Sequence, residues 1–289
     1  MRKIPPSELI INPDGSVFHL HLKPDQISNK IILVGDPARV DLIAKYFDNI
    51  EVNVSSREFH TVTGYYKGKR LSVVSHGIGT DNIDIVLTEL DALVNIDFNT
   101  REIKKELTSL ELVRVGTSGG IQTDIPMGSF VVSQTSIGFD GVLNFYANRD
   151  SVCNLDFEKK FVDFVDYPKQ AAAPYVVRAN PELVDRIAQS DMILGITISA
   201  NGFYGPQGRE VRLPLAKPEL NHKIEKFEYI GNKVTNYEME SSALAGLSLL
   251  MGHKAMTVCA IIANRVVKES NSDYSSYIVK LVETVLERI

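Results

Sequence analysis

The feature that most constrains the fold is a set of short apolar runs that each lead into a glycine-containing segment. Residues 31–34, 71–74 and 112–115 are rich in β-branched and aliphatic side chains, and the segments 35–39, 75–80 and 116–120 follow them. Apolar residues at helical spacing come after the first two segments. This alternation of strand, glycine turn and helix is typical of α/β folds, in which helices cover both faces of a sheet.

The remaining apolar runs continue the same pattern. We expect further strands at residues 51–54, 62–66, 130–133, 195–199, 233–237 and 257–262, with a hairpin turn at 67–69. We expect helices at residues 39–47, 81–94, 181–188, 243–251 and 274–288. No internal repeat or linker interrupts the chain. The sequence therefore predicts a single α/β domain over residues 1–289, with a central mixed β-sheet flanked by helices on both faces and with residues 1–16 as an N-terminal extension.

Charge and cysteine content exclude several classes of function. The chain has 31 basic and 36 acidic residues, so its net charge of −5 gives no general attraction to nucleic acid or to an anionic membrane. Cys153 and Cys259 lie far apart and match no disulfide or zinc pattern. No apolar run approaches the roughly 20 residues that span a bilayer, and the first residues lack the core of a signal peptide. We therefore expect a cytoplasmic protein without nucleic-acid or membrane partners.

Three arginines lie close to the ends of predicted strands. Arg39 follows the first glycine turn, Arg57 follows the strand at 51–54, and Arg114 interrupts the run at 112–115. Ligands of α/β sheets bind beyond the carboxyl ends of strands, where glycine turns can point backbone N–H groups at an anion. Alone, a buried Arg114 would favour a structural ion pair with an acidic residue. Three arginines together favour a phosphate-sized ligand, because guanidinium groups match phosphate geometry. No Walker or complete GxGxxG motif is present.

Two further segments carry groups suited to a base and a sugar. Gln207 and Arg209 follow Phe203 in a loop rich in glycine and proline, and such amide, guanidinium and aromatic groups can bind a planar base; alone, the segment could be a solvated loop. Glu238 and Glu240 precede a helical pattern and would share one face if their segment is extended, which suits sugar hydroxyls. The alternative is that Glu238 is solvated and Glu240 complements the helix N-terminus.

The histidines do not indicate a metal site. His19 and His21 alternate in a short segment, and the remaining four are scattered at His60, His76, His222 and His253. None has the HExxH spacing or a neighbouring carboxylate at ligand spacing. We therefore expect no catalytic metal.

A series of motifs resembles the nucleoside phosphorylase I family, and within it the uridine phosphorylases. In chain order they are GDPARV, SREF, SHGIGT, VRVGTSGGIQ, FYGPQGR and NYEMESSAL, and the resemblance runs from about residue 17 to residue 265. It implies a pentosyltransferase that cleaves uridine, with deoxyuridine and thymidine as further candidate substrates, by reversible phosphorolysis in pyrimidine salvage. The products would be uracil and (deoxy)ribose 1-phosphate. It also implies no cofactor, only nucleoside and phosphate as small-molecule partners, and a homo-oligomer that is either a hexamer built from dimers or a dimer.

The resemblance also implies a role for each matched residue. Phosphate would be bound by Gly35, Arg39, Arg57, Arg114 and Thr117, with Arg57 supplied by a neighbouring subunit. Ribose would be bound by His19 from the same neighbour and by Thr117, Glu238, Met239 and Glu240. The base would stack on Phe203 and be read by Gln207 and Arg209. Catalysis would rest on Arg39, Arg114, Gln207, Arg209 and Glu240.

Two departures from the family pattern bear on substrate and ion binding. Hexameric purine phosphorylases of the family have an aspartate acid where this chain has the tripeptide 263–265, Ala-Asn-Arg, so purine cleavage is disfavoured. A purine nucleoside phosphorylase or a hydrolytic nucleosidase of the same family remains the alternative. Some uridine phosphorylases bind a monovalent cation through positions matching Glu58 and Ile78 and through a serine where this chain has Asn82. Residues 95–106 match no motif of the family.

Overall fold

The computed structural model describes residues 2–271 and 273–289, and a large β-sheet lies at its centre. The strands of this sheet are β1 (Lys30–Val34), β2 (Asn49–Ser56), β3 (Phe59–Tyr66), β4 (Lys69–Ser75), β7 (Glu111–Gly120), β8 (Phe130–Gly138), β9 (Tyr175–Arg178), β10 (Ile193–Ser199), β11 (Glu228–Tyr229), β12 (Asn232–Glu238), β13 (Lys254–Asn264) and β14 (Glu269–Ser270). Their order is β11-β12-β10-β8-β13-β7-β1-β4-β3-β2, with β9 paired to β8 and β14 paired to β13.

The sheet is mixed, and part of it closes into a ring. β1 is parallel to both of its neighbours, β4 and β7, whereas β8 and β13 are antiparallel. β12 pairs with β10 on one side and, through Asn236 and Tyr237, with the end of β7 on the other. β7, β12, β10, β8 and β13 therefore form a closed ring, from which β1, β4, β3 and β2 continue as an open sheet. The predicted mixed sheet is confirmed.

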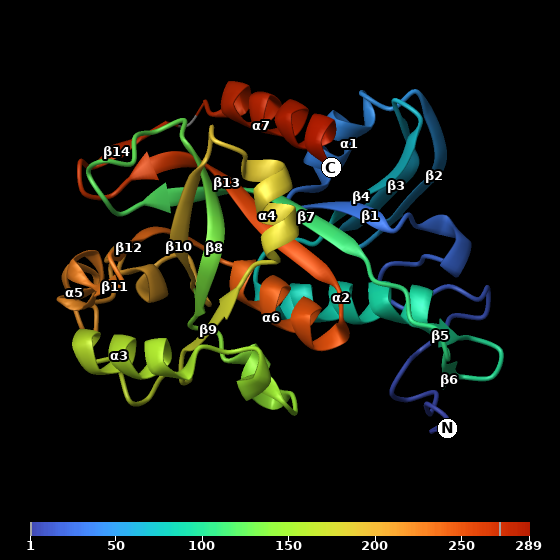
Figure 1. Cartoon of the computed structure of the whole chain (residues 1–289), viewed down its shortest axis with the longest axis horizontal. Helices are drawn as coiled ribbons and strands as arrows, with labels where there is room; N and C mark the ends of the chain where they lie inside the picture. The colour runs from blue at the N-terminus through green and yellow to red at the C-terminus, as the bar shows by residue number, and fades with distance from the viewer. Residues whose placement is uncertain (1, 272) are drawn as a thin grey trace.

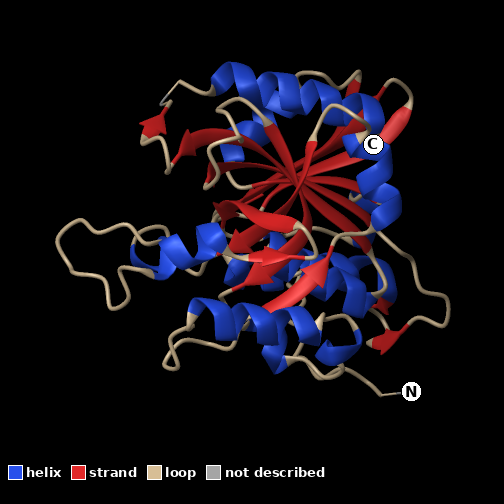
Figure 2. Cartoon of the chain, turned by 60° about the vertical axis from the view of Figure 1, so that its left-hand side comes forward, coloured by secondary structure: helices blue, strands red, loops and turns tan. Residues whose placement is uncertain are grey.

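Helices cover both faces of the sheet, as predicted (Figures 1 and 2). They are α1 (Pro37–Ala44), α2 (Thr80–Asn95), α3 (Leu155–Val165), α4 (Pro181–Ala188), α5 (Leu220–Lys226), α6 (Ser241–Met251) and α7 (Ser275–Arg288). Side chains alternate along β1: Ile32 and Val34 pack in the core with α1, α4 and α7, whereas Ile31 and Leu33 pack in the core with α2 and α6. No helix among the described residues is both long and apolar enough to cross a membrane.

Shorter elements complete the chain. Single turns of 3-10 helix lie at η1 (Pro24–Gln26), η2 (Val142–Phe145), η3 (Arg149–Ser151) and η4 (Gly205–Gln207). β5 (Ile96–Asp97) and β6 (Glu102–Ile103) form a separate two-stranded hairpin.

Most predicted elements are found, but the third glycine segment was misread. Every predicted strand lies within an observed strand, and each predicted helix overlaps an observed one. Residues 116–120, however, are not a turn, because they remain extended and form the second half of β7. Gly119 and Gly120 pair with β13 on one side and with β12 on the other. The prediction that this segment is a turn is therefore wrong, whereas the prediction that it binds an anion stays a prediction.

The segment that matches no motif, residues 95–106, holds the N-terminal extension. Arg101 in the β5–β6 hairpin donates hydrogen bonds to the carbonyl groups of Ile4, Pro5 and Leu9, and its own carbonyl accepts one from the Ile4 N–H. Leu9 packs with Ala92 and Ile96 in a small apolar cluster. The two segments therefore form one unit at the end of α2. Met1, the first residue of the predicted extension, lies outside the described residues.

The hairpin between β11 and β12 contains a strained residue and gives a test of stability. Tyr229 pairs with Asn232, so Ile230 and Gly231 form a two-residue turn with φ angles of 50° and 75°. Turns of this kind favour Asn-Gly, whereas a β-branched residue at positive φ is strained. We expect Ile230→Asn to raise the free energy of unfolding by about 1 kcal/mol, measured by urea denaturation. Ile230→Val keeps the β-branch and serves as the control; equal stability of the two variants would contradict the assignment of strain.

Candidate active site

A cavity of about 1120 Å³ lies beyond the ends of several strands and collects most of the predicted site residues. The predicted residues that line it are Gly35, Arg39, Arg114, Thr117, Phe203, Gln207, Arg209, Glu238, Met239 and Glu240. They come from the β1–α1 turn, from β7, from the loop after β10 and from the β12–α6 junction. The fold thus brings together segments up to about 200 residues apart in the sequence. His19 and Arg57 do not line this cavity.

Arg114 is the buried cation of the cavity, and two glutamates hold it. Its Nη1 lies 3.0 Å from Glu238 Oε2, and its Nη2 donates to Glu240 Oε2. Its Nε donates to His76 Nε2 at 3.2 Å. Burial opposes the charge on Arg114, but the two carboxylates outweigh it and raise the pKa of Arg114 above its ordinary value. The ion pair that was expected if Arg114 acted alone is therefore present, and it lies inside the cavity that also holds the residues predicted to bind a ligand.

Glycine at position 116 makes room for this guanidinium group. Arg114 and Gly116 lie two residues apart on β7, so they face the same side of the strand. A Cβ atom at position 116 would approach Arg114 Nη1 to 2.8 Å and Cys259 Sγ to 2.9 Å. The Arg114 side chain therefore occupies the space that a side chain at position 116 would need.

The two glutamates have different surroundings, and these do not match the alternative in which Glu238 is solvated and Glu240 complements the helix N-terminus. Glu238 is buried, not solvated, and its carboxylate accepts hydrogen bonds from the backbone N–H groups of Glu240 and Ser241 at the start of α6. It also accepts from the hydroxyl groups of Ser199 and Ser241. Glu238, and not Glu240, therefore complements the helix N-terminus.

Glu240 accepts fewer hydrogen bonds than Glu238. It stands at the N-cap of α6 without a capping hydrogen bond, and its Oε1 accepts from the Gly79 N–H at 2.7 Å. Burial raises the pKa of Glu240, while Arg114 opposes this shift and Glu238 adds to it. The two carboxylates thus stabilise the charge on Arg114, whereas burial disfavours the charge on Glu240. We take Glu240 as the group whose protonation is sensitive, because an arginine stays charged at any physiological pH.

Arg39 adds a second positive charge to the same end of the cavity. Its Nη1 donates to the carbonyl oxygen of Val115 at 3.3 Å, and no acidic side chain of the described residues forms an ion pair with it. Burial and the neighbouring Arg114 lower the pKa of Arg39, and burial together with both guanidinium groups lowers the pKa of His76 well below its usual value. Two close cations, only one of them neutralised, favour an anionic ligand.

Gln207 and Arg209, the pair predicted to read the base, both line the cavity, and their side chains bond to each other. Arg209 Nη1 donates to Gln207 Oε1 at 2.7 Å, and its Cζ lies 3.7 Å from the centroid of the Phe203 ring. Burial lowers the pKa of Arg209. One face of Phe203 is therefore covered by a guanidinium group. A stacked base would have to use the other face of Phe203 or displace Arg209.

Arg265 belongs to this group and was missed as a site residue. Its Nη2 donates to Gln207 Oε1 at 2.9 Å, and its Cζ lies 4.8 Å from the centroid of the Tyr237 ring. Burial, with a smaller effect of Arg209, lowers the pKa of Arg265 to about 10. From the sequence, position 265 was considered only for the acid that is lacking nearby. The signal that could have found it is a fourth arginine close to a strand end, directly after β13.

His19 and Arg57 lie together outside the cavity. His19 Nδ1 lies 2.6 Å from Glu89 Oε1 on α2, and Glu89 also accepts from the backbone N–H of His19. The Arg57 guanidinium lies 5.5 Å from the ring of Phe18, and Phe18 packs edge-to-face on His19. Their shared position away from the cavity of their own chain is compatible with the expected supply by a neighbour, which stays a prediction.

The positions expected to hold a monovalent cation lie at the rim of the cavity. Glu58, Ile78 and Asn82 all line it, and Asn82 Nδ2 lies 3.3 Å from Glu58 Oε1 as a hydrogen-bond donor. The amide thus points a nitrogen at the carboxylate, where a cation ligand would need an oxygen. Cation binding stays a prediction. Among the described residues, no group of three or more His, Cys, Asp or Glu side chains is arranged to hold a metal.

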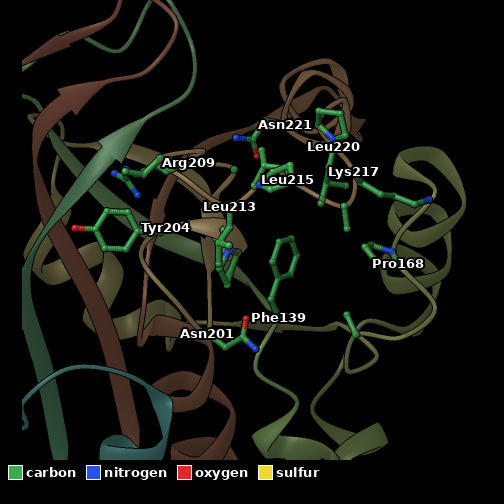
Figure 3. Close-up of a pocket in the computed structure, with 18 of the residues that line it drawn as sticks. Phe139, Pro168, Asn201, Tyr204, Arg209, Leu213, Leu215, Lys217, Leu220 and Asn221 are labelled. Atoms are coloured by element: carbon green, nitrogen blue, oxygen red, sulfur yellow. The ribbon is translucent and has the colours of Figure 1, made fainter.

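A second cavity of about 780 Å³ lies under the loop of residues 201–221 (Figure 3). Phe139 and Leu213 point into it, and Tyr204 and Arg209 lie at its edge. Its described lining residues include no aspartate, glutamate, histidine or cysteine. Because acid–base and anion-binding groups gather in the larger cavity, we assign the chemistry there. Arg209 lines both cavities.

Comparisons with known proteins agree with this assignment. The model of the phosphorylase superfamily matches residues 29–287. A uridine phosphorylase from Thermococcus kodakarensis is 30% identical over 262 residues, which cover 89% of this chain and 80% of the relative. A DeoD-type purine nucleoside phosphorylase from Buchnera aphidicola is 24% identical over 278 residues, which cover 95% of this chain and 99% of the relative.

A solved structure also matches the fold of this chain. A Trypanosoma brucei nucleoside phosphorylase that shows uridine phosphorylase activity superposes with a TM-score of 0.86 and 28% identity, covering 97% of this chain and 98% of the other. Sequence, fold and the contents of the cavity therefore agree. The chain belongs to the phosphorylase superfamily, and within it to the nucleoside phosphorylase I family with the uridine phosphorylases.

Proposed function

We propose that the protein is a pentosyltransferase that cleaves uridine by reversible phosphorolysis, giving uracil and ribose 1-phosphate. The observation that carries the proposal is a single cavity that combines a pair of guanidinium groups, a buried carboxylate and an amide–guanidinium cluster. These three groups match the phosphate, the sugar and the base of the reactants. The uridine phosphorylase from Thermococcus kodakarensis supports this choice of substrate.

Phosphate would bind between Arg39 and Arg114. The repulsion between these cations would fall when an anion binds, and Gly35 and Thr117 line the same part of the cavity. Four of the five N–H groups of Arg114 already face protein atoms in His76, Glu238, Cys259 and Glu240. Arg114 would therefore give phosphate one hydrogen bond while Arg39 gives the wider contact. Holding phosphate against the anomeric carbon is mainly a matter of positioning.

Ribose would lie beside Glu240 and Met239. As the glycosidic bond lengthens, the sugar gains positive character, which the Glu240 carboxylate favours while it orients the 2′-hydroxyl. Glu238 was predicted as a ribose ligand, but its oxygens already accept hydrogen bonds from α6, Ser199 and Arg114. We therefore propose that Glu238 fixes Arg114 and the start of α6, and that Glu240 is the sugar carboxylate.

Uracil would bind at Gln207, Arg209 and Arg265. Both lone pairs of the Gln207 amide oxygen are occupied by the two arginines, so one arginine must turn toward the base before this oxygen can accept a hydrogen bond from it. The negative charge that develops on the departing base would be stabilised by these guanidinium groups. No aspartate follows β13 to protonate a purine, which favours a pyrimidine.

The proposal includes a homo-oligomer in which a neighbouring chain supplies His19 and Arg57. Both residues lie outside the cavity of their own chain, close to each other and at the surface or half-buried. A cytoplasmic location is part of the proposal and is supported by two free cysteines. No cofactor enters the proposed reaction.

The first experiment measures base release from uridine, thymidine and inosine with and without inorganic phosphate. We expect uracil release from uridine only when phosphate is present, because phosphate is the attacking group. Release without phosphate would indicate a hydrolytic nucleosidase, and faster turnover of inosine would indicate a purine phosphorylase. Either result would contradict the proposed function.

The second prediction concerns the base-binding cluster. Arg209→Ala removes a guanidinium group from the developing charge on uracil, so kcat for uridine should fall by roughly 100-fold in steady-state kinetics. Arg212→Ala is the matched control, since Arg212 is an exposed arginine of the same loop that does not line the larger cavity. Equal activity of the two variants would remove Arg209 from the mechanism.

The third prediction separates the two glutamates. Glu238→Gln removes the charge that caps α6 and holds Arg114, so its main effect should be a loss of unfolding free energy of about 3 kcal/mol. Glu240→Gln should lower kcat for uridine more than Glu238→Gln does, with a smaller loss of stability. Thermal unfolding and uridine kinetics measured on both variants decide the matter. The reverse order of the two effects would show that the roles are exchanged.

A further inference from the structure

We propose that His76 is a positioning residue that fixes the orientation of the Arg114 guanidinium group through a neutral imidazole whose Nε2 is the hydrogen-bond acceptor. His76 is fully buried, directly follows β4, and donates its backbone N–H to the Val34 carbonyl at 2.8 Å. Neither the motif pattern nor the predicted site residues gave it a role. The inference rests on the proposed function for its effect on phosphate, but not for its chemistry.

The chemistry of the two partners fixes the tautomer. An arginine side chain has no acceptor atom, so the 3.2 Å contact between Arg114 Nε and His76 Nε2 requires a lone pair on Nε2. The proton of the neutral ring must then be on Nδ1. His76 Nδ1 is buried and has no hydrogen-bond partner among the described residues. Leaving a buried donor unsatisfied is unfavourable, so the fold accepts a cost at Nδ1 in order to keep the acceptor at Nε2.

The contact completes the enclosure of Arg114. Glu238 and Glu240 hold Nη1 and Nη2, and His76 holds Nε, so the guanidinium plane is fixed by three groups from three different elements. Without the Nε contact, the side chain could rotate about its last bonds while it still met one carboxylate. The remaining N–H of Nη2 would then lose its fixed direction into the cavity.

The His76 ring also lies close to the glycine that follows β1. A Cβ atom at Gly35 would lie 3.2 Å from the Gly77 carbonyl oxygen and 3.8 Å from His76 Cε1, so the Gly77 carbonyl leaves the least room for a side chain there. The imidazole ring is thus near the turn that leads from β1 to Arg39. His76 therefore lies beside both Arg114 and the Gly35 turn, the two sides of the proposed phosphate site.

The tautomer can be measured on the unmodified chain by nitrogen NMR of labelled histidine at pH 7, with the His76 signals assigned by their loss in His76→Gln. We expect Nδ1 to carry the proton and Nε2 to be unprotonated. A proton on Nε2, in either the other tautomer or the doubly protonated ring, would overturn the inference. This result does not depend on which nucleoside is cleaved, so it separates the inference from the proposed function.

The effect on the site is tested by the binding of inorganic phosphate, measured by calorimetry on His76→Gln and His76→Asn. A glutamine oxygen takes the place of Nε2, whereas an asparagine oxygen takes the place of Nδ1. We expect His76→Gln to stay within about threefold of the unmodified chain and His76→Asn to weaken phosphate binding by about tenfold or more. Equal affinities of the two variants, with both folded by circular dichroism, would overturn the inference.

Discussion

A buried guanidinium group is the constraint on which the rest of the active site depends. Removing the charge of Arg114 from water is expensive, and the cost is offset only by well-placed carboxylates and by acceptors for the remaining N–H groups. Glu238, Glu240 and His76 provide these partners, and Gly116 provides the space. Each partner lies at a junction of the fold: Glu238 at the end of β12, Glu240 at the start of α6 and His76 after β4. The ion pair therefore joins both halves of the sheet.

The path of β7 makes these junctions meet. Through Gly119 and Gly120, the end of β7 pairs with β13 on one side and with β12 on the other, and this pairing closes the ring of five strands. Tyr237, the residue before Glu238, is itself in that pairing. The register of the ring thus sets the distance between Arg114 and Glu238. In a flat sheet, β10, β8 and β13 would lie between β12 and β7, and the carboxylates would not reach the arginine.

The sequence predicted the elements and the composition of the site better than its contacts. Strands such as 112–115 and helices such as 181–188 follow from periodicity alone, and glycine-rich strand ends indicated where to look. The extended course of 116–120 was not predictable, because glycine is common in turns and the ring closure that keeps it extended is a long-range pairing. Arg265 and His76 were missed because their roles arise from packing against Gln207 and Arg114, which lie far away in the sequence. Helix α3 was missed although Phe157 and Phe161 have helical spacing.

The distribution of charge in the cavity gives a physical reason why the proposed reaction can develop negative charge on the base and positive charge on the sugar. Arg39 and Arg114 form one pair of neighbouring guanidinium groups in the cavity, Arg209 and Arg265 form a second pair, and the buried carboxylate of Glu240 is ion-paired with Arg114. Burial and the neighbouring arginine lower the pKa of Arg39 in the first pair and of Arg265 in the second, so each pair is poised to accept negative charge. In the proposed reaction, phosphate would bring that charge to Arg39 and Arg114, and the departing base would develop it beside Arg209 and Arg265. Glu240 would face the sugar, the reactant that becomes more positive as the bond breaks. Charges placed in this way would stabilise the transition state more than either ground state, which is the condition for catalysis.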